Sequence, residues 1–422
     1  MKEPSFALIA NRNLDRVLLA DGQPPAAGSL TGVRYAPVTS VVYGDYILCI
    51  GDGAGEKPFE WAAAETVSPT VRDGLAAIAA ERERKHTVVR ALPDLLVPWY
   101  DRNKRDLPWR RSADPYRVWL SEIMLQQTRV EAVREYFNRF VRELPDVAAL
   151  AACPDDRLLK LWEGLGYYSR ARNLKKAAAA IVQAGAFPNT RAGLAALPGI
   201  GDYTAGAVAS IAFGLPEAAV DGNVLRVAAR AAECFPETGD TKWRKALDSA
   251  LSAVYPTGKC AEFTQSFMDL GATVCLPESP RCEVCPLAAV CLARARGSIA
   301  RLPVRTRAAA KVTEYKTVFV LTHEGKYAVQ KRADSGLLAG LWEFPNVAGT
   351  LDDTAAAAWL TEQGVLPEGE FTRTSARHVF THRVWEMRVY TVPCRTPGRL
   401  VWRDPADPEV ALPTAFRTCL PD

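Results

Sequence analysis

Four cysteines lie close enough together in the sequence to hold one metal centre. The spacing C-x6-C-x2-C-x5-C, within 17 residues, is formed by Cys275, Cys282, Cys285 and Cys291. Four thiolates in one short loop suit an iron–sulfur cluster or a structural zinc ion. Zinc usually takes two separated CxxC or CxxH pairs, whereas this loop has one CxxC flanked by two single cysteines. The spacing predicts a metal centre, and the alternative is a chance group of structural cysteines.

Two carboxylates stand in polar motifs within apolar helical patterns. Glu122 lies in W-L-S-E-I-M-L-Q-Q-T, and Asp221 lies in V-D-G-N. Taken alone, Glu122 would be a solvated helix residue, and Asp221 or Asn223 would cap a helix that starts at Val224. The catalytic alternative is a carboxylate that faces a developing cation.

A Gly-x-Gly turn lies between two helical patterns, at Leu197-Pro198-Gly199-Ile200-Gly201, with the second helix expected from about Thr204. Such a turn lets a ligand approach the backbone closely and directs the free N–H groups of the second helix at an anion. It could therefore bind the phosphate backbone of a nucleic acid without reading its sequence. The alternative is an ordinary turn between helices.

The elements that must position these residues differ along the chain. Its 422 residues, 48% of them hydrophobic, are enough for two or three domains with a sizeable core. Residues 1–88 combine short β-like stretches with an amphipathic helix over Thr70–Lys85, and the sequence assigns them no role. Residues 89–291 are a succession of helical patterns, 292–312 form a basic linker, and 313–422 alternate as strands. The predicted fold is mainly α, with a small N-terminal α+β segment and a C-terminal α+β domain.

Individual elements are expected at definite places. Helices are expected over Asp155–Trp162, Ala205–Phe213 and Thr354–Gln363. Strands are expected at both ends of the chain, over Ala7–Ala10, Val17–Ala20, Val38–Tyr43, Tyr46–Ile50, Thr317–Leu321, Tyr327–Lys331 and Val389–Val392.

The charge and the cysteine content of the chain limit its possible partners and its cellular compartment. The net charge of +4 is too small to indicate a nucleic-acid partner. A basic run without an intervening acid follows the cysteine loop and would be a solvated linker or a phosphate contact, at Arg294, Arg296, Arg301, Arg305, Arg307 and Lys311. No signal segment stands near Met1 and no apolar run has the length of a membrane span, so we expect a reducing, cytoplasmic setting.

Taken together, these motifs resemble those of the adenine DNA glycosylases, which belong to the helix-hairpin-helix, endonuclease III-like superfamily and carry a Nudix-like C-terminal domain. Besides the cysteines, the carboxylates and the glycine turn, the matching stretches are Leu107–Arg110, Ser121–Thr128 and Gly164–Leu174. They cover residues 89 to 291. The resemblance continues more weakly over 313–422, where Gly336–Pro345 is similar to a Nudix strand and turn, and Phe380-Thr381-His382 to the Phe-Ser-His motif of the family.

The resemblance implies a monofunctional enzyme that acts as a monomer on double-stranded DNA, where it flips and removes adenine opposite 8-oxoguanine or guanine. Glu122 would protonate the adenine and then help water attack. Asp221 would stabilise the sugar cation or bind it transiently, with Tyr203 and Asn223 in support. Strand-cutting relatives have a lysine where this chain has Tyr203, and tyrosine cannot form a Schiff base.

The resemblance also assigns the remaining site residues. Cys275, Cys282, Cys285 and Cys291 would bind a 4Fe-4S cluster, and Gly199 and Gly201 would contact the DNA backbone. Tyr167 would be a wedge beside the oxidised guanine and Gln127 would insert into the base stack, although Tyr167 and Tyr168 could instead be core aromatics. The adenine pocket would be lined by Trp109 and Arg110. The oxidised guanine would be read by Phe380, Thr381 and His382.

Three departures from the family pattern qualify the resemblance. Asp202 follows the glycine turn, where an acid should weaken a phosphate contact. The family often has a pocket acid before Leu-Gly-Ala, and in this chain that acid is Asp269, whose side chain is shorter than that of a glutamate. The C-terminal part lacks the Arg-Glu-x-x-Glu-Glu pattern that holds magnesium in Nudix hydrolases, so we expect it to read the lesion only. The competing hypotheses are an endonuclease III-like glycosylase/lyase for oxidised pyrimidines and a non-catalytic lesion-binding protein.

Overall fold

The structure is a computed structural model of the chain that describes residues 6–10, 17–21, 41–43, 46–49, 60–63, 69–304, 310–404 and 406–420. The chain divides into two compact units. Unit 1 joins Met1–Arg105 to Ala205–Thr306, and unit 2 joins Asp106–Thr204 to Arg307–Asp422. The predicted helical region is therefore shared between the two units.

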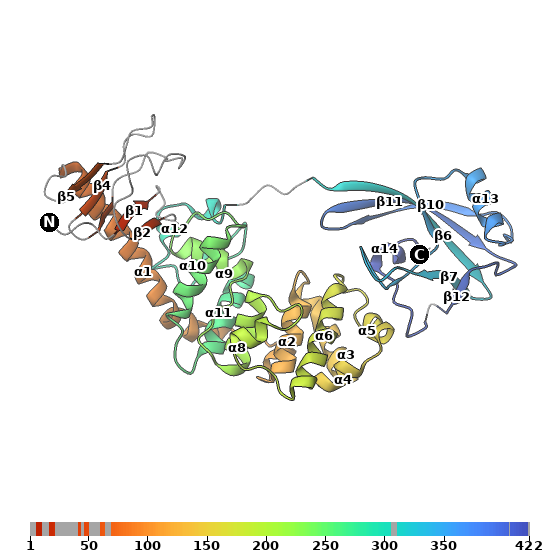
Figure 1. The fold of residues 1–422 in the computed structure, drawn as a ribbon, viewed down its shortest axis with the longest axis horizontal. Helices are drawn as coiled ribbons and strands as arrows, with labels where there is room; N and C mark the ends of the chain where they lie inside the picture. The colour runs from red at the N-terminus through yellow and green to blue at the C-terminus, as the bar shows by residue number, and fades with distance from the viewer. Residues whose placement is uncertain are drawn as a thin grey trace. The chain divides into compact units, whose positions relative to one another are not determined.

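The N-terminal strands of unit 1 form antiparallel pairs, as the sequence pattern predicts (Figure 1). The first pair is β1 (Phe6–Ala10) with β2 (Val17–Asp21). The second sheet contains β3 (Val41–Tyr43), β4 (Tyr46–Cys49) and β5 (Glu60–Ala63). Residues 11–16 and 44–45, between the paired strands, lie outside the described residues.

Helix α1 (Pro69–Asn103) is longer than the predicted helix over Thr70–Lys85 and runs across the predicted boundary at residue 88. It contains Pro93 and Pro98, each of which removes one backbone hydrogen bond from a helix. Burial of one face offsets that loss. The buried face recurs every three or four residues, at Val88, Leu92, Leu96, Trp99 and Tyr100.

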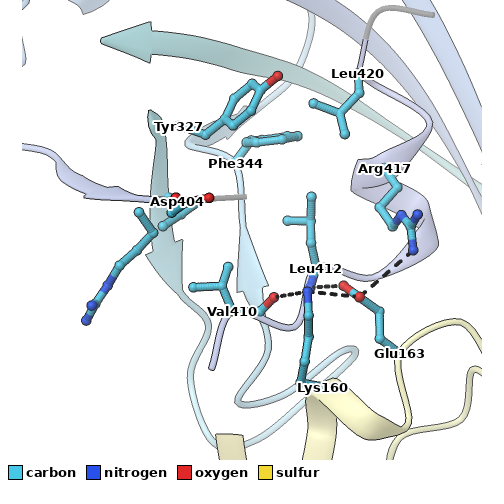
Figure 2. A pocket seen from close by; sticks show the side chains of 11 residues that line it. Lys160, Glu163, Tyr327, Phe344, Asp404, Val410, Leu412, Arg417 and Leu420 are labelled. Carbon is cyan, nitrogen blue, oxygen red and sulfur yellow. Dashed lines mark hydrogen bonds and ion pairs between the residues drawn. The ribbon is translucent and has the colours of Figure 1, made fainter. Parts of the chain in front are cut away.

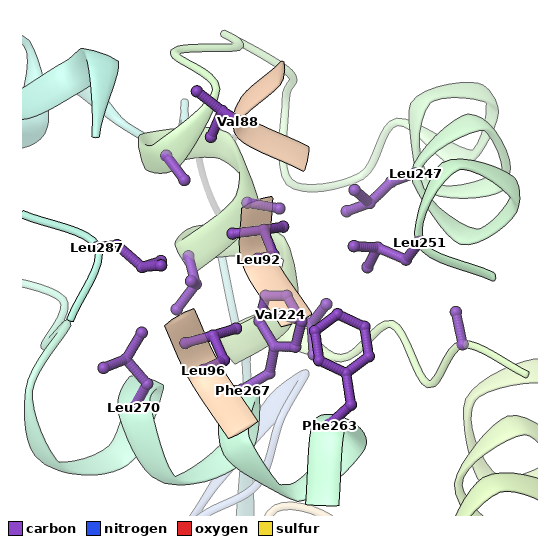
Figure 3. Close-up of a cluster of buried hydrophobic side chains, with 14 of the residues drawn as sticks. Val88, Leu92, Leu96, Val224, Leu247, Leu251, Phe263, Phe267, Leu270 and Leu287 are labelled. Carbon is purple, nitrogen blue, oxygen red and sulfur yellow. The ribbon is translucent and has the colours of Figure 1, made fainter. Parts of the chain in front are cut away.

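The core of unit 1 forms where α1 packs against the helices that follow residue 205 (Figure 3). These helices are α9 (Gly222–Ala231), α10 (Thr241–Ser252) and α11 (Cys260–Thr273). Buried side chains from all four helices meet in one cluster, and the cysteine loop packs against it through Cys275 and Cys285. The loop continues through η3 (Cys282–Val284), α12 (Leu292–Ala295) and η4 (Ile299–Arg301).

Part of the basic run after the cysteines is used inside unit 1. The guanidinium of Arg296 donates two 2.7 Å hydrogen bonds to the Glu81 carboxylate and also pairs with Glu233. Arg305 and Arg307 lie outside the described residues. Among the helices that the structure describes, none is long and apolar enough to span a bilayer.

The helical part of unit 2 begins with η2 (Pro108–Arg110) and ends where α8 (Asp202–Phe213) starts. Aspartate or threonine side chains cap several of its helices, as at Asp114, Asp146 and Thr190. Trp119, Phe140 and Trp162 are fully buried. The helices between η2 and α8 are α2 (Pro115–Leu125), α3 (Val130–Glu143), α4 (Val147–Ala152), α5 (Asp155–Leu161), α6 (Ser169–Ala184) and α7 (Arg191–Ala195).

The C-terminal part of unit 2 is the predicted α+β domain. Its mixed sheet has the order β10-β11-β6-β7-β12, with β11 and β6 parallel, while β8 pairs with β7 and β9 with β6. The strands are β6 (Val312–His323), β7 (Lys326–Lys331), β8 (Trp342–Glu343), β9 (Asn346–Ala348), β10 (Thr372–Val379), β11 (Arg383–Pro393) and β12 (Val401–Arg403).

Both faces of this sheet are covered. Along β6, Val318 and Val320 join one buried cluster with α14 (Thr414–Arg417), whereas Phe319 and Leu321 join another with α13 (Asp353–Glu362). Successive side chains of a strand point to opposite faces, so this alternation fixes one helix on each face. The helix expected over Thr354–Gln363 is α13. Strands β10 and β11 form an antiparallel hairpin in this sheet (Figure 1).

Candidate active site and metal centre

The first candidate catalytic group is the carboxyl group of Glu122 in unit 2. Helix α2 buries nearly all of its residues from Tyr116 to Met124, and Glu122 is only 4% exposed. The expectation that Glu122, taken alone, is a solvated residue is therefore wrong. Its Oε2 accepts a 2.6 Å hydrogen bond from the Tyr203 hydroxyl at the start of α8. A buried carboxyl group without a donor would be costly, so this bond fixes its orientation.

A second contact joins the same two helices. Gln126, just after α2, donates from Nε2 to Thr204 Oγ1 over 3.2 Å. Because Thr204 follows Tyr203 in α8, the two hydrogen bonds together set how the end of α2 meets the start of α8.

Asp221 is the second candidate catalytic group and lies in unit 1. It is the N-cap of α9, because its Oδ1 accepts from the Val224 N–H over 2.7 Å. The capping interpretation is thus confirmed, and it leaves Oδ2 to accept from Asn223 Nδ2 over 3.1 Å. Capping and catalysis are compatible, since each uses a different oxygen.

Asn223 is itself held from two sides. Its Oδ1 accepts a 2.8 Å hydrogen bond from Arg226, whose guanidinium also donates to the carbonyl groups of Gly271 and Cys275. A Cβ atom on Gly271 would lie 2.6 Å from the Asn223 Cβ, so only glycine leaves room for Asn223 there. The sequence analysis missed Arg226; its position three residues after Asn223, on the same helix face, was the available signal.

Burial and hydrogen bonding act in opposite directions on Asp221. Burial raises the pKa of its carboxyl group above the usual value of an aspartate, and this effect is the largest. The donors at Val224 and Asn223 and the charge of Arg226 oppose it, because they stabilise the ionised form. Removing a donor should therefore raise this pKa further.

The glycine turn precedes Tyr203 directly. Gly199 has φ +77°, and a Cβ atom there would lie 2.6 Å from the Cβ of Asn173, so the turn requires glycine. Ile200 is buried, whereas Gly201 and Asp202 are exposed at the start of α8. The exposed backbone can approach an anion, and Asp202 places an acid in the first turn, where it opposes a phosphate but favours the helix dipole.

The two residues expected to enter the base stack share an unusual conformation. Gln127 has φ +57° and Tyr167 has φ +46°, and both side chains are exposed. Tyr168 is 4% exposed and belongs to the core, so the core interpretation holds for Tyr168 and is wrong for Tyr167. Strained, exposed residues of this kind cluster at functional sites.

Tyr167 also contacts the hairpin that carries Phe380, Thr381 and His382. Its hydroxyl lies 2.8 Å from Thr381 Oγ1, at the tip between β10 and β11. Thr381 and His382 are exposed there, while Phe380 packs edge-on against Trp385 at 4.8 Å. Tyr167 and the Phe380-Thr381-His382 segment are thus brought together by a hydrogen bond between residues 214 positions apart.

Lys160 and Glu163, at the end of α5 and just after it, form a second contact with the C-terminal part of unit 2, at Val410 and Leu412 (Figure 2). The Glu163 carboxylate accepts from the Leu412 N–H over 2.7 Å and pairs with Lys160 at 3.1 Å. Lys160 donates to the Val410 carbonyl over 2.9 Å. These contacts border a cavity that Tyr327 and other side chains of the sheet also line.

The four cysteines line one pocket in unit 1, with Arg230 beside them. Arg230 is buried and lies 3.5 Å from Cys275 Sγ, while it donates to three backbone carbonyl groups. Burial raises the pKa of Cys285 to about 11, so its thiolate needs a nearby cation or metal. The donor set and the adjacent guanidinium fit a cluster of iron and sulfide.

A single bound ion would need closer ligands. In the described part of the chain, no three His, Cys, Asp or Glu side chains are grouped as one ion requires. In a 4Fe-4S cluster, the four thiolates are ligands of a larger group.

Two expected site residues have structural contacts. Trp109 is 5% exposed and packs edge-on against Phe137 at 5.5 Å, with Arg110 beside it in η2. Asp269 is fully buried in unit 1, where it pairs with Arg105 at 2.6 Å. The place of Trp109 and Arg110 in an adenine pocket stays a prediction.

Known proteins share these features. The profile of the HhH-GPD superfamily base excision DNA repair protein matches residues 120–252, and a NUDIX domain profile matches residues 317–422. The adenine DNA glycosylase of Homo sapiens is 34% identical over 364 residues, which are 72% of this chain and 67% of the human protein. The adenine DNA glycosylase of Buchnera aphidicola (strain APS) is 32% identical over 68% of this chain and 82% of its own length.

The chain belongs to the adenine DNA glycosylase family. It spans a smaller share of other members, such as 61% of the mouse adenine DNA glycosylase, to which it is 36% identical. In the present chain, the NUDIX profile covers the domain that contains helix α13, whose sequence is DTAAAAWLTE. That helix lacks the cluster of glutamates that would hold magnesium in a hydrolase.

Substitution Asn223→Ala is expected to move the acidic limit of adenine excision to higher pH. Asn223 donates to Asp221, so its loss raises the pKa of that carboxyl group, which is already raised by burial. A carboxylate is ionised only above its pKa, and activity that needs the ionised form is lost as the pH falls through that value. Single-turnover excision rates between about pH 4 and 8 would measure the shift. Asn138→Ala, at an exposed site on α3, is the matched control; an unchanged acidic limit in Asn223→Ala would contradict the assignment.

Proposed function

We propose that the protein is a monofunctional glycosylase that removes adenine mispaired with 8-oxoguanine or guanine from double-stranded DNA. The observation that carries the proposal is the buried Glu122 carboxyl group, held by Tyr203 at 2.6 Å in a chain of this family. Adenine inside a duplex is not accessible to such a buried group. The base is therefore flipped out of the stack before the reaction.

Glu122 acts first as an acid. When the bond between the sugar and adenine breaks, its electron pair leaves with the base, and a proton from Glu122 neutralises the negative charge that develops there. Tyr203 donates to Oε2 and thereby orients the carboxyl group that gives its proton to the adenine. The ionised Glu122 then accepts a proton from the water molecule that attacks the sugar.

Asp221 stabilises the positive charge on the sugar. Its two oxygens are oriented by Val224 and Asn223, so little reorganisation is needed as the charge forms. A carboxylate in this role acts as an electrostatic partner or as a transient covalent one, as in retaining glycosidases. Tyr203 supplies no amine, which argues against the lyase alternative.

The exposed features of the chain support DNA binding. The backbone at Gly199 and Gly201 approaches a phosphate, while Gln127 and Tyr167 enter the stack and replace the stacking that the flipped base gives up. Trp109 and Arg110 contact the flipped adenine. One chain carries both carboxylates, the cysteine loop and the lesion hairpin, which supports action as a monomer.

The cysteine loop holds a 4Fe-4S cluster through Cys275, Cys282, Cys285 and Cys291. The cluster contributes structure, because it would fix a loop that otherwise packs on the core through few apolar side chains. Arg230 offsets part of the thiolate charge from 3.5 Å.

Substitution Glu122→Gln should leave binding to an adenine:8-oxoguanine duplex intact and lower single-turnover excision by roughly 10²- to 10⁴-fold, because the general acid is lost. Asp221→Asn should also preserve binding, since asparagine caps a helix as well as aspartate does, but should lower excision sharply. Alkali cleavage at the abasic product measures excision.

Glu135→Gln, at an exposed position of α3, controls for the loss of a carboxylate elsewhere in unit 2. Near wild-type excision by both Glu122→Gln and Asp221→Asn would refute the catalytic assignment. The non-catalytic lesion-binding hypothesis would then be the better one.

Purified protein should contain about four iron atoms and four sulfides per chain, with broad visible absorption. Cys282→Ser should lose most of this absorption, whereas Cys234→Ser, outside the pocket, should retain it. Stoichiometric zinc without iron would overturn the cluster assignment.

Thr381→Val should reduce the preference for 8-oxoguanine over guanine opposite adenine by about 2- to 10-fold, the usual effect of one hydrogen bond. The ratio of single-turnover rates on the two duplexes measures this preference. Thr374→Val, exposed on strand β10 of the same hairpin, is the matched control. An equal loss on both duplexes would show that Thr381 supports stability and not lesion reading.

A further inference from the structure

One guanidinium in unit 2 binds backbone groups from two separate loops. Arg170 lies in the first turn of α6, and its side chain is half-buried. The loop after α2 carries Gln127, and the loop before α6 carries Tyr167. The hydrogen bonds of Arg170 run from Nη1 to the carbonyl oxygens of Ile123 (2.6 Å), Met124 (3.2 Å) and Gln126 (2.6 Å), and from Nη2 to those of Leu165 (3.0 Å) and Gly166 (3.1 Å).

Two of these hydrogen bonds are accepted by the peptide groups directly before Gln127 and Tyr167, the groups next to the φ bonds of these residues. The Gln126 carbonyl belongs to the peptide bond that precedes Gln127, and the Gly166 carbonyl belongs to the one that precedes Tyr167. Both Gln127 and Tyr167 have positive φ, a conformation that residues other than glycine rarely adopt. Such a conformation persists only where its surroundings enforce it. Arg170 supplies the same constraint to both.

Arg170 also contacts the wedge directly. The centre of its guanidinium lies 5.5 Å from the Tyr167 ring centroid and 5.4 Å from that of Trp162. Burial lowers the pKa of Arg170 to about 10, so the group keeps its charge at neutral pH. A guanidinium has five N–H donors in a fixed planar fork and can reach carbonyl oxygens of two loops at once, whereas a lysine has three donors on a single nitrogen and reaches fewer of them.

The same helix reaches the glycine turn. Asn173, one turn after Arg170, packs against Gly199 so closely that a Cβ atom there would clash with it. Arg170, Asn173 and Gly199 line a common cavity of about 150 Å³. Helix α6 thus connects the two strained loops with the proposed phosphate contact.

We propose that Arg170 is a positioning residue that holds Gln127 and Tyr167 in the conformations in which they enter the DNA stack, so that flipping of adenine depends on it. This inference rests on the proposed function, because it deepens the roles given there to Gln127 and Tyr167. Arg170 itself does not touch the reacting atoms.

The test compares flipping and excision in Arg170→Met and Arg170→Lys. Flipping is followed by the fluorescence of 2-aminopurine opposite 8-oxoguanine in a duplex, and excision by single-turnover rates on adenine opposite 8-oxoguanine. Arg170→Met should reduce both, with excision falling about 100-fold, the size of effect expected from misplacing positioning groups by about 1 Å. Arg170→Lys should recover only a small part of the flipping and excision that Arg170→Met loses. Arg139→Met, which removes a guanidinium bound to the single carbonyl of Leu161, should stay within about threefold of wild type.

A double-mutant cycle separates positioning from general stability. In a Gln127→Ala/Tyr167→Ala background, Arg170→Met should lower the single-turnover excision rate further by less than about threefold, because the residues through which Arg170 acts are gone. A full 100-fold loss in that background would overturn the inference, as would normal flipping in Arg170→Met. If Arg170→Met does not fold, as judged by circular dichroism and melting, the same cycle with Arg170→Lys decides. A wild-type protein that excises no adenine would instead refute the proposed function.

Discussion

The hydrogen bond between Tyr203 and Glu122 is the interaction on which the proposed catalytic arrangement depends. A carboxyl group that is 4% exposed needs a fixed donor, and α8 can supply one only if its first turn meets the buried face of α2. The glycine turn lies directly before that first turn. The same local geometry therefore both orients the acid and exposes the backbone of Gly201 for an anion.

At Asp221, a structural role as helix cap is compatible with the chemical role that we propose for the same side chain. One oxygen caps α9, and the other accepts from Asn223, which is in turn fixed by Arg226 and by the absence of a side chain at Gly271. The cap makes the position of the carboxylate independent of any ligand. A stabiliser of a short-lived cation works best when it is already in place.

The C-terminal domain uses the sheet of the NUDIX fold as a scaffold for a hairpin. Burial of both faces of β6 fixes the sheet, and the hairpin of β10 and β11 places Thr381 2.8 Å from the Tyr167 hydroxyl. Helix α13, rich in alanine, contributes packing, and its acids, Asp353 and Glu362, stand at its two ends and do not form the glutamate cluster of a magnesium site. The domain thus keeps the architecture of the NUDIX family, and the contact with Tyr167 is made by the loop at the tip of the hairpin.

Short-range features of this protein were determined by the sequence alone. The cysteine spacing, the glycine turn, the alternation in β6 and β11 and the helical periodicity of α5 each depend on neighbours a few residues away, and the predicted elements were found. The length of α1 was not predicted, because its two prolines act locally while the burial of its face depends on α9 and α11. Only the tertiary structure decided that Glu122 is buried, that Tyr167 is exposed while Tyr168 is not, and that Arg170 joins two loops. Burial and hydrogen bonding of these groups come from residues distant in sequence, whose approach no local pattern encodes.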